Sequence, residues 1–359
     1  MKKVLCLIDG LGSGGAQRQL VGLANLLKGK GYDVLFVWYH NSDFYKKNLE
    51  DNGIDYEQIY AKTVFQKFWR VKNVISRFRP DAIISYIDGP NMAICLLKAF
   101  GLKSTVIVSE RAVLQTINAR QKRKFFLYRW ADYVVSNAQD QTNLINRYFP
   151  KLERKTRTIR NFVDTNYFCP SEKKIENNGI QILVVGRIAK QKNIERFMQA
   201  ISKSISHGAN VYVKWFGGTS FGQENYKEEI ENLCQEFRLG ERFVFYPPSN
   251  NILEEYQHCD VFCLPSLFEG FPNVVCEAMS CGKPILCSDV NDNAVIVHHN
   301  DNGFLFDPKS IDDMTDKIET LCKMSVKERL EMGKKSRKIA EDNLSGESFV
   351  NKYIDLIEN

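Results

Sequence analysis

The 359-residue sequence has no apolar run long enough to cross a membrane. A spanning helix needs roughly 18–20 consecutive apolar residues. The first apolar run, VLCLI, is short and ends at Asp9. We therefore expect a first β-strand there, and neither a transmembrane helix nor a signal peptide.

The ten cysteines show no C-x-x-C spacing and no nearby histidine cluster. Their distribution argues against both a zinc site and a disulfide framework. Most lie in apolar segments, so we expect reduced core residues of a cytosolic protein. The sequence also has no short-period repeat and no low-complexity segment, which argues against a solenoid.

The length predicts two domains, and the charge is divided unevenly between the two halves of the chain. Residues 1–165 contain 27 Lys+Arg and 14 Asp+Glu, a net charge of +13. The remainder contains 49−27=22 basic and 43−14=29 acidic residues, a net charge of −7. A basic first half indicates contact with a polyanion or an anionic membrane surface.

Short apolar strands alternate with helical patterns throughout, which predicts an α/β protein with doubly wound parallel sheets. The polar segment 168–179 is the expected connection between two such units, and the tail from about residue 309 is expected to be helical. The strands of the first unit are expected at 4–8, 33–39, 81–87, 105–110 and 132–138, and those of the second at 180–186, 210–218, 242–248, 260–266, 284–290 and 303–307.

A glycine-rich loop, DGLGSGG, follows the first strand and precedes a helix. Gly10, Gly12 and Gly15 have the spacing G-x-G-x-x-G, and backbone amides at such a helix N-terminus can approach a phosphate. A dinucleotide site also needs an acidic residue after the second strand, where Asp43 lies rather far along the chain. The pattern is compatible with a phosphate- or acceptor-facing loop, a nicotinamide site or a tight turn.

Two cations follow the first strand of the second unit. Arg187 and Lys192 lie in RIAKQKN, after the strand ILVVG. Open α/β sheets bind ligands at the carboxyl ends of their strands, and two cations there suit a diphosphate. A solvated basic turn is the alternative interpretation.

The stretch PSLFEGFPNVVCEAMSCGKPIL places Glu269 in a loop and Glu277 in a predicted helix over 273–281. The helix N-terminus favours the negative charge of a diphosphate. Glu277 could accept hydrogen bonds from a ribose diol, and Glu269 could reach a sugar. The alternative is a glutamate that stabilises the helix dipole and a solvated loop glutamate.

Taken together, these segments resemble retaining glycosyltransferases of family 4, which carry the E-x7-E signature on the two-domain GT-B fold. The order and spacing of the motifs carry the resemblance over nearly the whole chain. They are GSGGAQRQL, ADYVVSNA, NFVDTNYF, VVGRIAKQKN and CDVFCLPSLFEGFPNVVCEAMSCGKPIL.

The resemblance implies a nucleotide-sugar substrate and a division of roles among residues. Arg187, Lys192 and Glu269 would be catalytic, with the two cations offsetting charge on the leaving diphosphate. Departure and attack on one face of the sugar would need no protein base. The absence of D-x-D agrees with a metal-independent enzyme without a cofactor. The implied donor-binding residues are Gly14, Gly15, Gly186, Arg187, Lys192, Glu269, Gly270, Phe271, Asn273, Val274 and Glu277.

One departure from the family concerns a histidine that many members carry near the donor sugar. The corresponding strands here end in SYIDGPN and VSERAV, without a histidine. Asp88, Asn91, Glu110 and Arg111 are the polar candidates to face the sugar or the acceptor instead.

The family fold implies an acceptor-binding domain over 1–165 and a donor-binding domain over 166–343. The active site would lie in the cleft between them. The C-terminal helix, about 344–359, is expected to cross back onto the first domain.

The variants GGAQRQ and SERAV are most similar to bacterial enzymes that extend lipid-diphosphate-linked oligosaccharides. The donor would carry a hexose or N-acetylhexosamine, UDP-linked by expectation. In residues 62–80, Phe65, Phe68, Trp69, Ile75 and Phe78 are expected on one helical face among basic residues, and residues 120–130 repeat this mixture. We expect a cytoplasmic protein, peripheral at the inner face of the membrane. A surface helix that packs its aromatics on the core is the alternative.

Other functions share parts of this pattern. A nucleotide-sugar epimerase would have the same fold and donor site, and a non-catalytic protein could bind the donor without turnover. An NAD-dependent oxidoreductase would depend on the glycine loop alone. Nucleic acid is not an expected partner, because no docking motif accompanies the basic charge.

Overall fold

The computed structural model describes residues 1–12, 14–111, 116–171, 179–219, 224–249 and 251–359. The chain forms two compact units: Met1–Phe162 with Gly346–Asn359, and Val163–Ser345. The sequence analysis placed these transitions between residues 165 and 166 and near residue 344. Residues 172–178 of the expected connection and 112–115 after VSER lie outside the described residues.

The first unit is built on a seven-stranded sheet in the order β3-β2-β1-β4-β5-β6-β7, and all paired strands are parallel. The chain winds outward from β1 in one direction and from β4 in the other. This order confirms the expected doubly wound sheet. The strands are β1 (Lys3–Leu7), β2 (Asp33–Trp38), β3 (Asp55–Gln58), β4 (Ala82–Tyr86), β5 (Thr105–Glu110), β6 (Tyr133–Ser136) and β7 (Thr156–Thr158).

The second unit has a six-stranded sheet in the order β10-β9-β8-β11-β12-β13, again with parallel pairing. The direction of winding changes between β8 and β11. The strands are β8 (Ile180–Val185), β9 (Val211–Phe216), β10 (Phe243–Tyr246), β11 (Val261–Leu264), β12 (Ile285–Ser288) and β13 (Gly303–Phe306).

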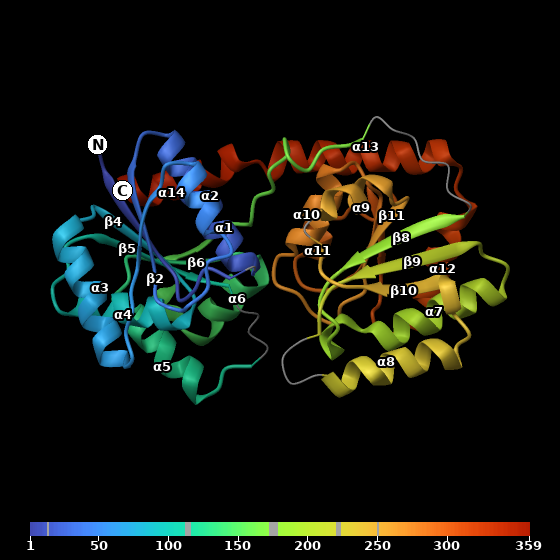
Figure 1. The fold of residues 1–359 in the computed structure, drawn as a ribbon, viewed down its shortest axis with the longest axis horizontal. Coiled ribbons are helices and arrows are strands. Elements are labelled where there is room, and N and C mark those ends of the chain that lie inside the picture. The colour runs from blue at the N-terminus through green and yellow to red at the C-terminus, as the bar shows by residue number, and fades with distance from the viewer. Residues whose placement is uncertain (13, 112–115, 172–178, 220–223, 250) are drawn as a thin grey trace. The chain divides into compact units, whose positions relative to one another are not determined.

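Helices connect the strands and cover both faces of each sheet (Figure 1). Over the described residues, none of these helices is both long and apolar enough to cross a membrane. The helices of the first unit are α1 (Gly15–Gly29), α2 (Lys46–Asp51), α3 (Val64–Phe78), α4 (Asp88–Ala99), α5 (Ala119–Tyr128), α6 (Gln139–Tyr148), η1 (Pro150–Leu152) and α14 (Gly346–Glu358). Those of the second unit are η2 (Lys190–Lys192), α7 (Ile194–Ser206), α8 (Glu224–Glu236), η3 (Gly240–Arg242), α9 (Ile252–His258), α10 (Asn273–Ser280), α11 (Asn293–Ile296), α12 (Ile311–Lys323) and α13 (Val326–Asn343).

The central strands of each sheet are apolar along most of their length because the sheet is buried on both faces. In β1, Val4 and Cys6 belong to the core that also contains α1 and α14, whereas Leu5 and Leu7 belong to the core that contains α3, α4 and α5. In β8, neighbouring residues divide in the same way between α7, α8 and α12 on one face and α9 and α10 on the other. The alternation follows from side chains that point to opposite faces of a strand.

The aromatic residues of α3 do not share one face, so this part of the sequence analysis was wrong. Ile75 is buried and Phe68 packs against the core, whereas Phe65 is 69% exposed and Trp69 is 43% exposed. With 3.6 residues per turn, Phe65 and Phe78 lie well apart around the helix. The core holds one side of α3 and leaves a pair of aromatic rings on the surface.

The C-terminal helix α14 packs on α1 and is joined to the first sheet by a buried polar network. The Tyr353 hydroxyl lies 2.9 Å from the Tyr86 hydroxyl at the end of β4. Arg111 donates hydrogen bonds to Tyr86, to Tyr353 (2.8 Å) and to Asn161 Oδ1 (2.5 Å). Burial raises the pKa of Tyr86 well above its ordinary value, so the hydroxyl stays protonated. Arg111 therefore binds α14 to the strands that it covers.

Tyr353→Phe should lower the stability of the first unit. The change leaves two buried polar groups, on Tyr86 and Arg111, without one partner each, which costs about 1–2 kcal/mol. Thermal and urea unfolding of the full chain measure the effect. Tyr60→Phe is the matched control because Tyr60 is 66% exposed. Equal unfolding midpoints for Tyr353→Phe and the wild type would contradict the structural role of this network.

Candidate functional site

The strand order of the second sheet creates a ligand-binding position between β8 and β11. These strands are neighbours, but the chain leaves them toward opposite sides of the sheet. The loops that follow their carboxyl ends therefore diverge and leave space between them, as in other open α/β sheets. The loop after β8 contains residues 186–193, and the loop after β11 contains residues 265–272.

The β8 loop carries the two cations predicted from the sequence. Arg187 is exposed and has no hydrogen-bond or ion-pair partner among the described residues. Lys192 is partly buried at the end of η2. A Cβ atom added at Gly186 would lie 3.2 Å from Lys192 Cε, so the glycine leaves room for the lysine side chain. One cation is thus free in solvent and the other is held.

Lys192 is held by Glu269 of the β11 loop. Lys192 Nζ lies 2.5 Å from Glu269 Oε1, and the two side chains are only 12% and 13% exposed. The sequence placed these residues in one site but did not predict their ion pair. A charge-assisted hydrogen bond of this kind, largely removed from water, is stronger than a surface ion pair.

Further hydrogen bonds join the same two loops. The Leu267 amide donates to the Gln191 carbonyl, and the Gln191 side chain donates to the Phe268 carbonyl, both at 2.8 Å. The Glu269 amide donates to Asn291 Oδ1 at 3.0 Å. Asn291 has a positive φ of 48° and comes from the loop after β12. No motif surrounds Asn291, so the sequence did not predict its place in this site.

Helix α10 directs its N-terminus into the same loop region. It begins at Asn273, its N-cap residue Pro272 makes no side-chain cap hydrogen bond, and its first turn has no acidic residue. The amides of Asn273 and Val274 lie in this first turn, where they favour an anion. Gly270 and Phe271 lead into the helix, with Phe271 buried in the core. The predicted helix over 273–281 agrees with α10 to within its last residue.

Glu277 lies one turn into α10 and is only 3% exposed. The Tyr256 hydroxyl donates a hydrogen bond to Glu277 Oε2 at 2.8 Å. Tyr256 is fully buried on α9 and was not predicted from the sequence. A buried carboxylate needs such partners, because desolvation without hydrogen bonds is costly. Tyr256 therefore fixes the orientation of Glu277.

The candidates in the first unit lie at the carboxyl edge of its own sheet. Gly14 is the N-cap residue of α1, in the extended conformation, and Gly15 is the first helical residue. Residue 13 lies outside the described residues. Asp88 begins α4 directly after β4, the strand next to β1. These loops flank the switch point between β1 and β4, where an open sheet places its ligand site.

A buried lysine joins two of these candidates. Lys124 Nζ lies 3.0 Å from Asp88 Oδ1 and also forms a short ion pair with Glu110. Lys124 and Glu110 are each 2% exposed, whereas the Asp88 side chain is 26% exposed. The preceding Ile87 has φ 75° and ψ 151°, a strained conformation for a β-branched residue. The sequence analysis treated Lys124 only as part of a basic segment.

The other two candidates are tied to the interior of the unit. Asn91 is fully buried, and its side-chain amide donates to the Ser109 carbonyl (2.9 Å) and to the Tyr128 hydroxyl (3.0 Å). Arg111 is the centre of the network around α14 described above. Of the two carboxylates among the four candidates, Asp88 is thus more accessible than Glu110.

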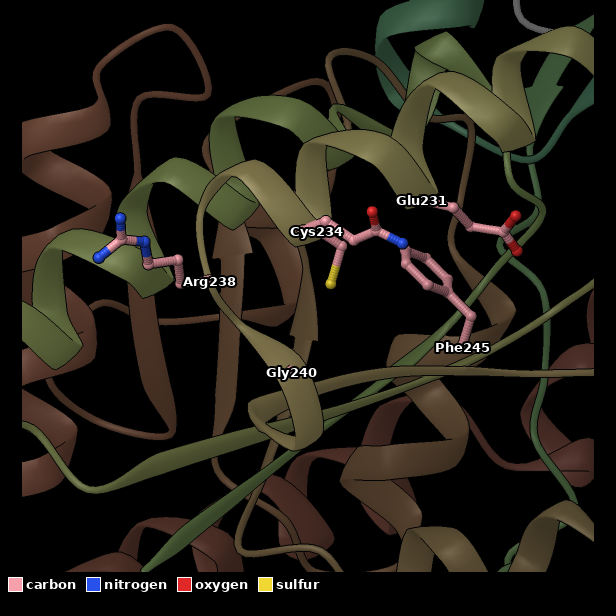
Figure 2. Close-up of a pocket in the computed structure, with 6 residues that line it drawn as sticks. Glu231, Cys234, Arg238, Gly240 and Phe245 are labelled. Carbon is pink, nitrogen blue, oxygen red and sulfur yellow. The ribbon is translucent and has the colours of Figure 1, made fainter.

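A separate surface depression of about 640 Å³ lies between α8 and β10. Figure 2 shows Glu231 and Cys234 of α8 opposite Phe245 of β10. Burial raises the pKa of the Cys234 thiol, so at neutral pH it stays protonated and is a poor nucleophile. The depression contains none of the predicted site residues. Its lining residues are Glu231, Cys234, Gln235, Arg238, Gly240 and Phe245.

Thiol chemistry and metal binding find little support in the described part of the chain. All ten cysteines are free. Burial raises the pKa of Cys6 and of Cys259 to about 12. Among the residues that the structure describes, no group of three or more His, Cys, Asp or Glu side chains is arranged to hold a metal ion. The cation and carboxylate loops of the second unit are therefore the strongest candidate site.

Comparison with known proteins places both units in known families. Residues 13–167 match the family model described as "Glycosyltransferase Family 4", and residues 170–339 match "Glycosyl transferases group 1". An uncharacterized glycosyltransferase of Haemophilus influenzae is 27% identical over 353 residues, covering 95% of this chain and 96% of the relative.

A second relative has a defined activity. It is the Campylobacter jejuni GalNAc-alpha-(1->4)-GalNAc-alpha-(1->3)-diNAcBac-PP-undecaprenol alpha-1,4-N-acetyl-D-galactosaminyltransferase. That enzyme is 28% identical over 295 residues, covering 78% of this chain and 77% of its own length.

The fold is shared with solved structures. The structure of Anabaena HepE in complex with UDP-glucose has a TM-score of 0.88 and 19% sequence identity, with full coverage of both chains. At this level of identity the similarity speaks for the fold alone. The two family matches follow one another along the chain, and they show that this protein is a glycosyltransferase of family 4 with the GT-B fold.

Proposed function

We propose that this glycosyltransferase moves a hexose or N-acetylhexosamine from a UDP-sugar to a hydroxyl of a lipid-diphosphate-linked glycan, with retention of configuration. The observation that carries the donor part is the arrangement of Arg187, Lys192 and Glu269 beside the N-terminus of α10. The acceptor class is supported by the Campylobacter relative, whose name specifies an undecaprenol-linked substrate. The UDP donor is supported by HepE, which binds UDP-glucose on the same fold.

The diphosphate of the donor binds between the β8 loop and the start of α10. Arg187 offers a free planar guanidinium that suits two phosphate oxygens. The amides of residues 270–274 add neutral donors, and the helix dipole adds a fixed partial positive charge. Lys192 completes the set as a second cation. Gly186 matters because it allows the ligand and the lysine to approach the backbone closely.

The sugar and the ribose are held by separate carboxylates. Glu277, fixed by Tyr256, accepts hydrogen bonds from the ribose hydroxyls. Glu269 accepts hydrogen bonds from the transferred sugar. In the first unit, Gly14 and Gly15 lie at the same sheet edge as Asp88, and this edge is the proposed binding surface for the acceptor.

Catalysis in this proposal is electrostatic. When the bond between the anomeric carbon and the phosphate oxygen breaks, negative charge grows on the diphosphate, and Arg187 and Lys192 stabilise it. The acceptor hydroxyl attacks from the same face and passes its proton to the departing phosphate oxygen. No protein base and no metal ion are needed, and the positions of the two cations carry most of the rate enhancement.

A membrane-facing surface on α3 fits a lipid-linked acceptor. Val64 is 83% exposed, and the centroids of the exposed Phe65 and Trp69 rings lie 5.9 Å apart. Lys72 lies over the Trp69 ring, and Arg70 is exposed on the same helix. Exposed aromatic and basic side chains together suit the surface of an anionic bilayer. The location would be cytoplasmic, at the inner face of the membrane.

Thermal unfolding with UDP, GDP, ADP, NAD and NADP tests the donor class. A ligand at about 100 times its dissociation constant stabilises the folded state by about 2.7 kcal/mol. UDP should therefore raise the midpoint by several degrees, while NAD and NADP leave it unchanged. If NAD raised the unfolding midpoint and no nucleoside diphosphate did, the glycine loop would be the nucleotide site and the oxidoreductase alternative would be favoured.

Lys192→Ala and Glu277→Gln should each lower kcat/KM for the UDP-sugar. The expected loss of transition-state stabilisation is about 2–4 kcal/mol for each variant. Glutamine at 277 retains an acceptor for the Tyr256 hydroxyl, so the fold is preserved. Lys203→Ala is the control, because this lysine pairs with Asp312 on the surface. Near-wild-type turnover in either site variant would remove that residue from the proposed donor site.

The double change Phe65→Ser and Trp69→Ser should weaken sedimentation with phosphatidylglycerol vesicles about tenfold or more, because two exposed aromatic rings are lost. Turnover of a short water-soluble acceptor should stay unchanged. Phe100→Ser is the control, since Phe100 is 82% exposed at the end of α4. Equal vesicle binding of the double variant and the wild type would contradict a membrane role for α3.

A further inference from the structure

The ion pair between Lys192 and Glu269 poses a problem for nucleotide binding. In this structure, the Lys192 ammonium group is paired with the Glu269 carboxylate at 2.5 Å. Arg187 is the only one of the two site cations without a partner among the described residues. A diphosphate that enters this site therefore meets the unpaired Arg187, a Lys192 that is already paired, and the negative charge of Glu269.

The pair is fixed by its surroundings. The Lys192 stem lies against Gly186, where any side chain would come within 3.2 Å of it. Asn291 holds the backbone of Glu269, and Gln191 joins the two loops on either side of the pair. With both side chains nearly nine-tenths buried, water screens the interaction weakly. The pair therefore competes effectively with an incoming phosphate.

We propose that Glu269 withholds Lys192 from a sugar-free nucleoside diphosphate, and so weakens binding of the product UDP. The inference rests on the proposed function. When a UDP-sugar is bound, sugar hydroxyls donate hydrogen bonds to Glu269 and satisfy its carboxylate, which lets Lys192 turn toward the diphosphate. After transfer the sugar is absent, Glu269 binds Lys192 again, and UDP loses a cation.

This arrangement separates two requirements of the enzyme. The transition state needs both cations, because charge on the diphosphate is then growing. Product release needs a weak UDP site, and release limits turnover in many enzymes. If sugar hydroxyls engage the Glu269 carboxylate only while the sugar is bound, Lys192 is available in the transition state and withdrawn from UDP afterwards. Glu269 is thus a residue that contacts the sugar and also controls the availability of Lys192.

The test is calorimetric titration of UDP into the full-length wild type, Glu269→Gln, Lys192→Met and the double variant. Glu269→Gln should bind UDP about tenfold more tightly than the wild type, and it should transfer sugar more slowly. In the Lys192→Met background, the same glutamine should change UDP affinity by less than about twofold, because there is no ammonium group to release. A tenfold change in affinity is the size expected for gaining or losing one charge–charge interaction near a protein surface, and a twofold change is well below it.

Glu255→Gln is the matched control. Glu255 pairs with Lys214 at 3.0 Å in the same unit, away from the β8 and β11 loops. Its loss changes the net charge equally and should leave UDP affinity at the wild-type value. Unfolding midpoints of all variants show that each is folded before titration.

Three results would overturn the inference. In the first, Glu269→Gln binds UDP no more tightly than the wild type. In the second, it tightens UDP equally with and without Lys192, which would mean direct repulsion between carboxylate and phosphate. In the third, Glu255→Gln has the same effect, which would mean a general charge effect. If the wild type binds no UDP at all, the proposed UDP-sugar function fails as well. The three results above, in which the wild type does bind UDP, overturn only the role of Glu269.

Discussion

The change of winding direction between β8 and β11 is the constraint on which the candidate site depends. Two neighbouring parallel strands that pass their chains to opposite sides of a sheet leave their loops apart at one edge. Into this space the β8 loop brings Lys192 and the β11 loop brings Glu269, from segments far apart in the sequence. Each remaining feature of the site, including the start of α10, is positioned by the strand that precedes it.

The first sheet repeats this arrangement between β1 and β4 with different side chains. Its edge carries Asp88, paired with a buried lysine and preceded by a strained Ile87. Strain of this kind persists only where the surrounding structure enforces it. The two units therefore place different charged groups at the same position of the fold: Arg187 and Lys192 follow β8 in the second unit, whereas Asp88 follows β4 in the first.

The sequence predicted the strands whose apolar runs are long, because both faces of each sheet are buried. It did not predict β3 and β7, whose sequences DYEQ and TRT are polar and which form the two edges of the first sheet. These two edge strands carry few apolar side chains, so no apolar pattern marks them in the sequence. The aromatic residues of α3 were assigned to one face because their spacing was counted too loosely around the helix.

The site shows the same division. Arg187, Lys192, Glu269 and Glu277 are recognisable as candidates from the sequence because they belong to local motifs. Tyr256, Asn291 and Lys124 were missed, since each acts on a residue that is distant in sequence and close only after folding. Local spacing reveals charged groups near a strand end, whereas the partners that orient them depend on tertiary packing.

A crystal structure of the chain with UDP shows which of the two sheet edges binds the nucleotide. We expect phosphate oxygens within hydrogen-bond distance of the Arg187 guanidinium and the amides at the start of α10, with the ribose at Glu277. A nucleotide bound at the glycine loop of the first unit, with the second unit empty, would contradict it.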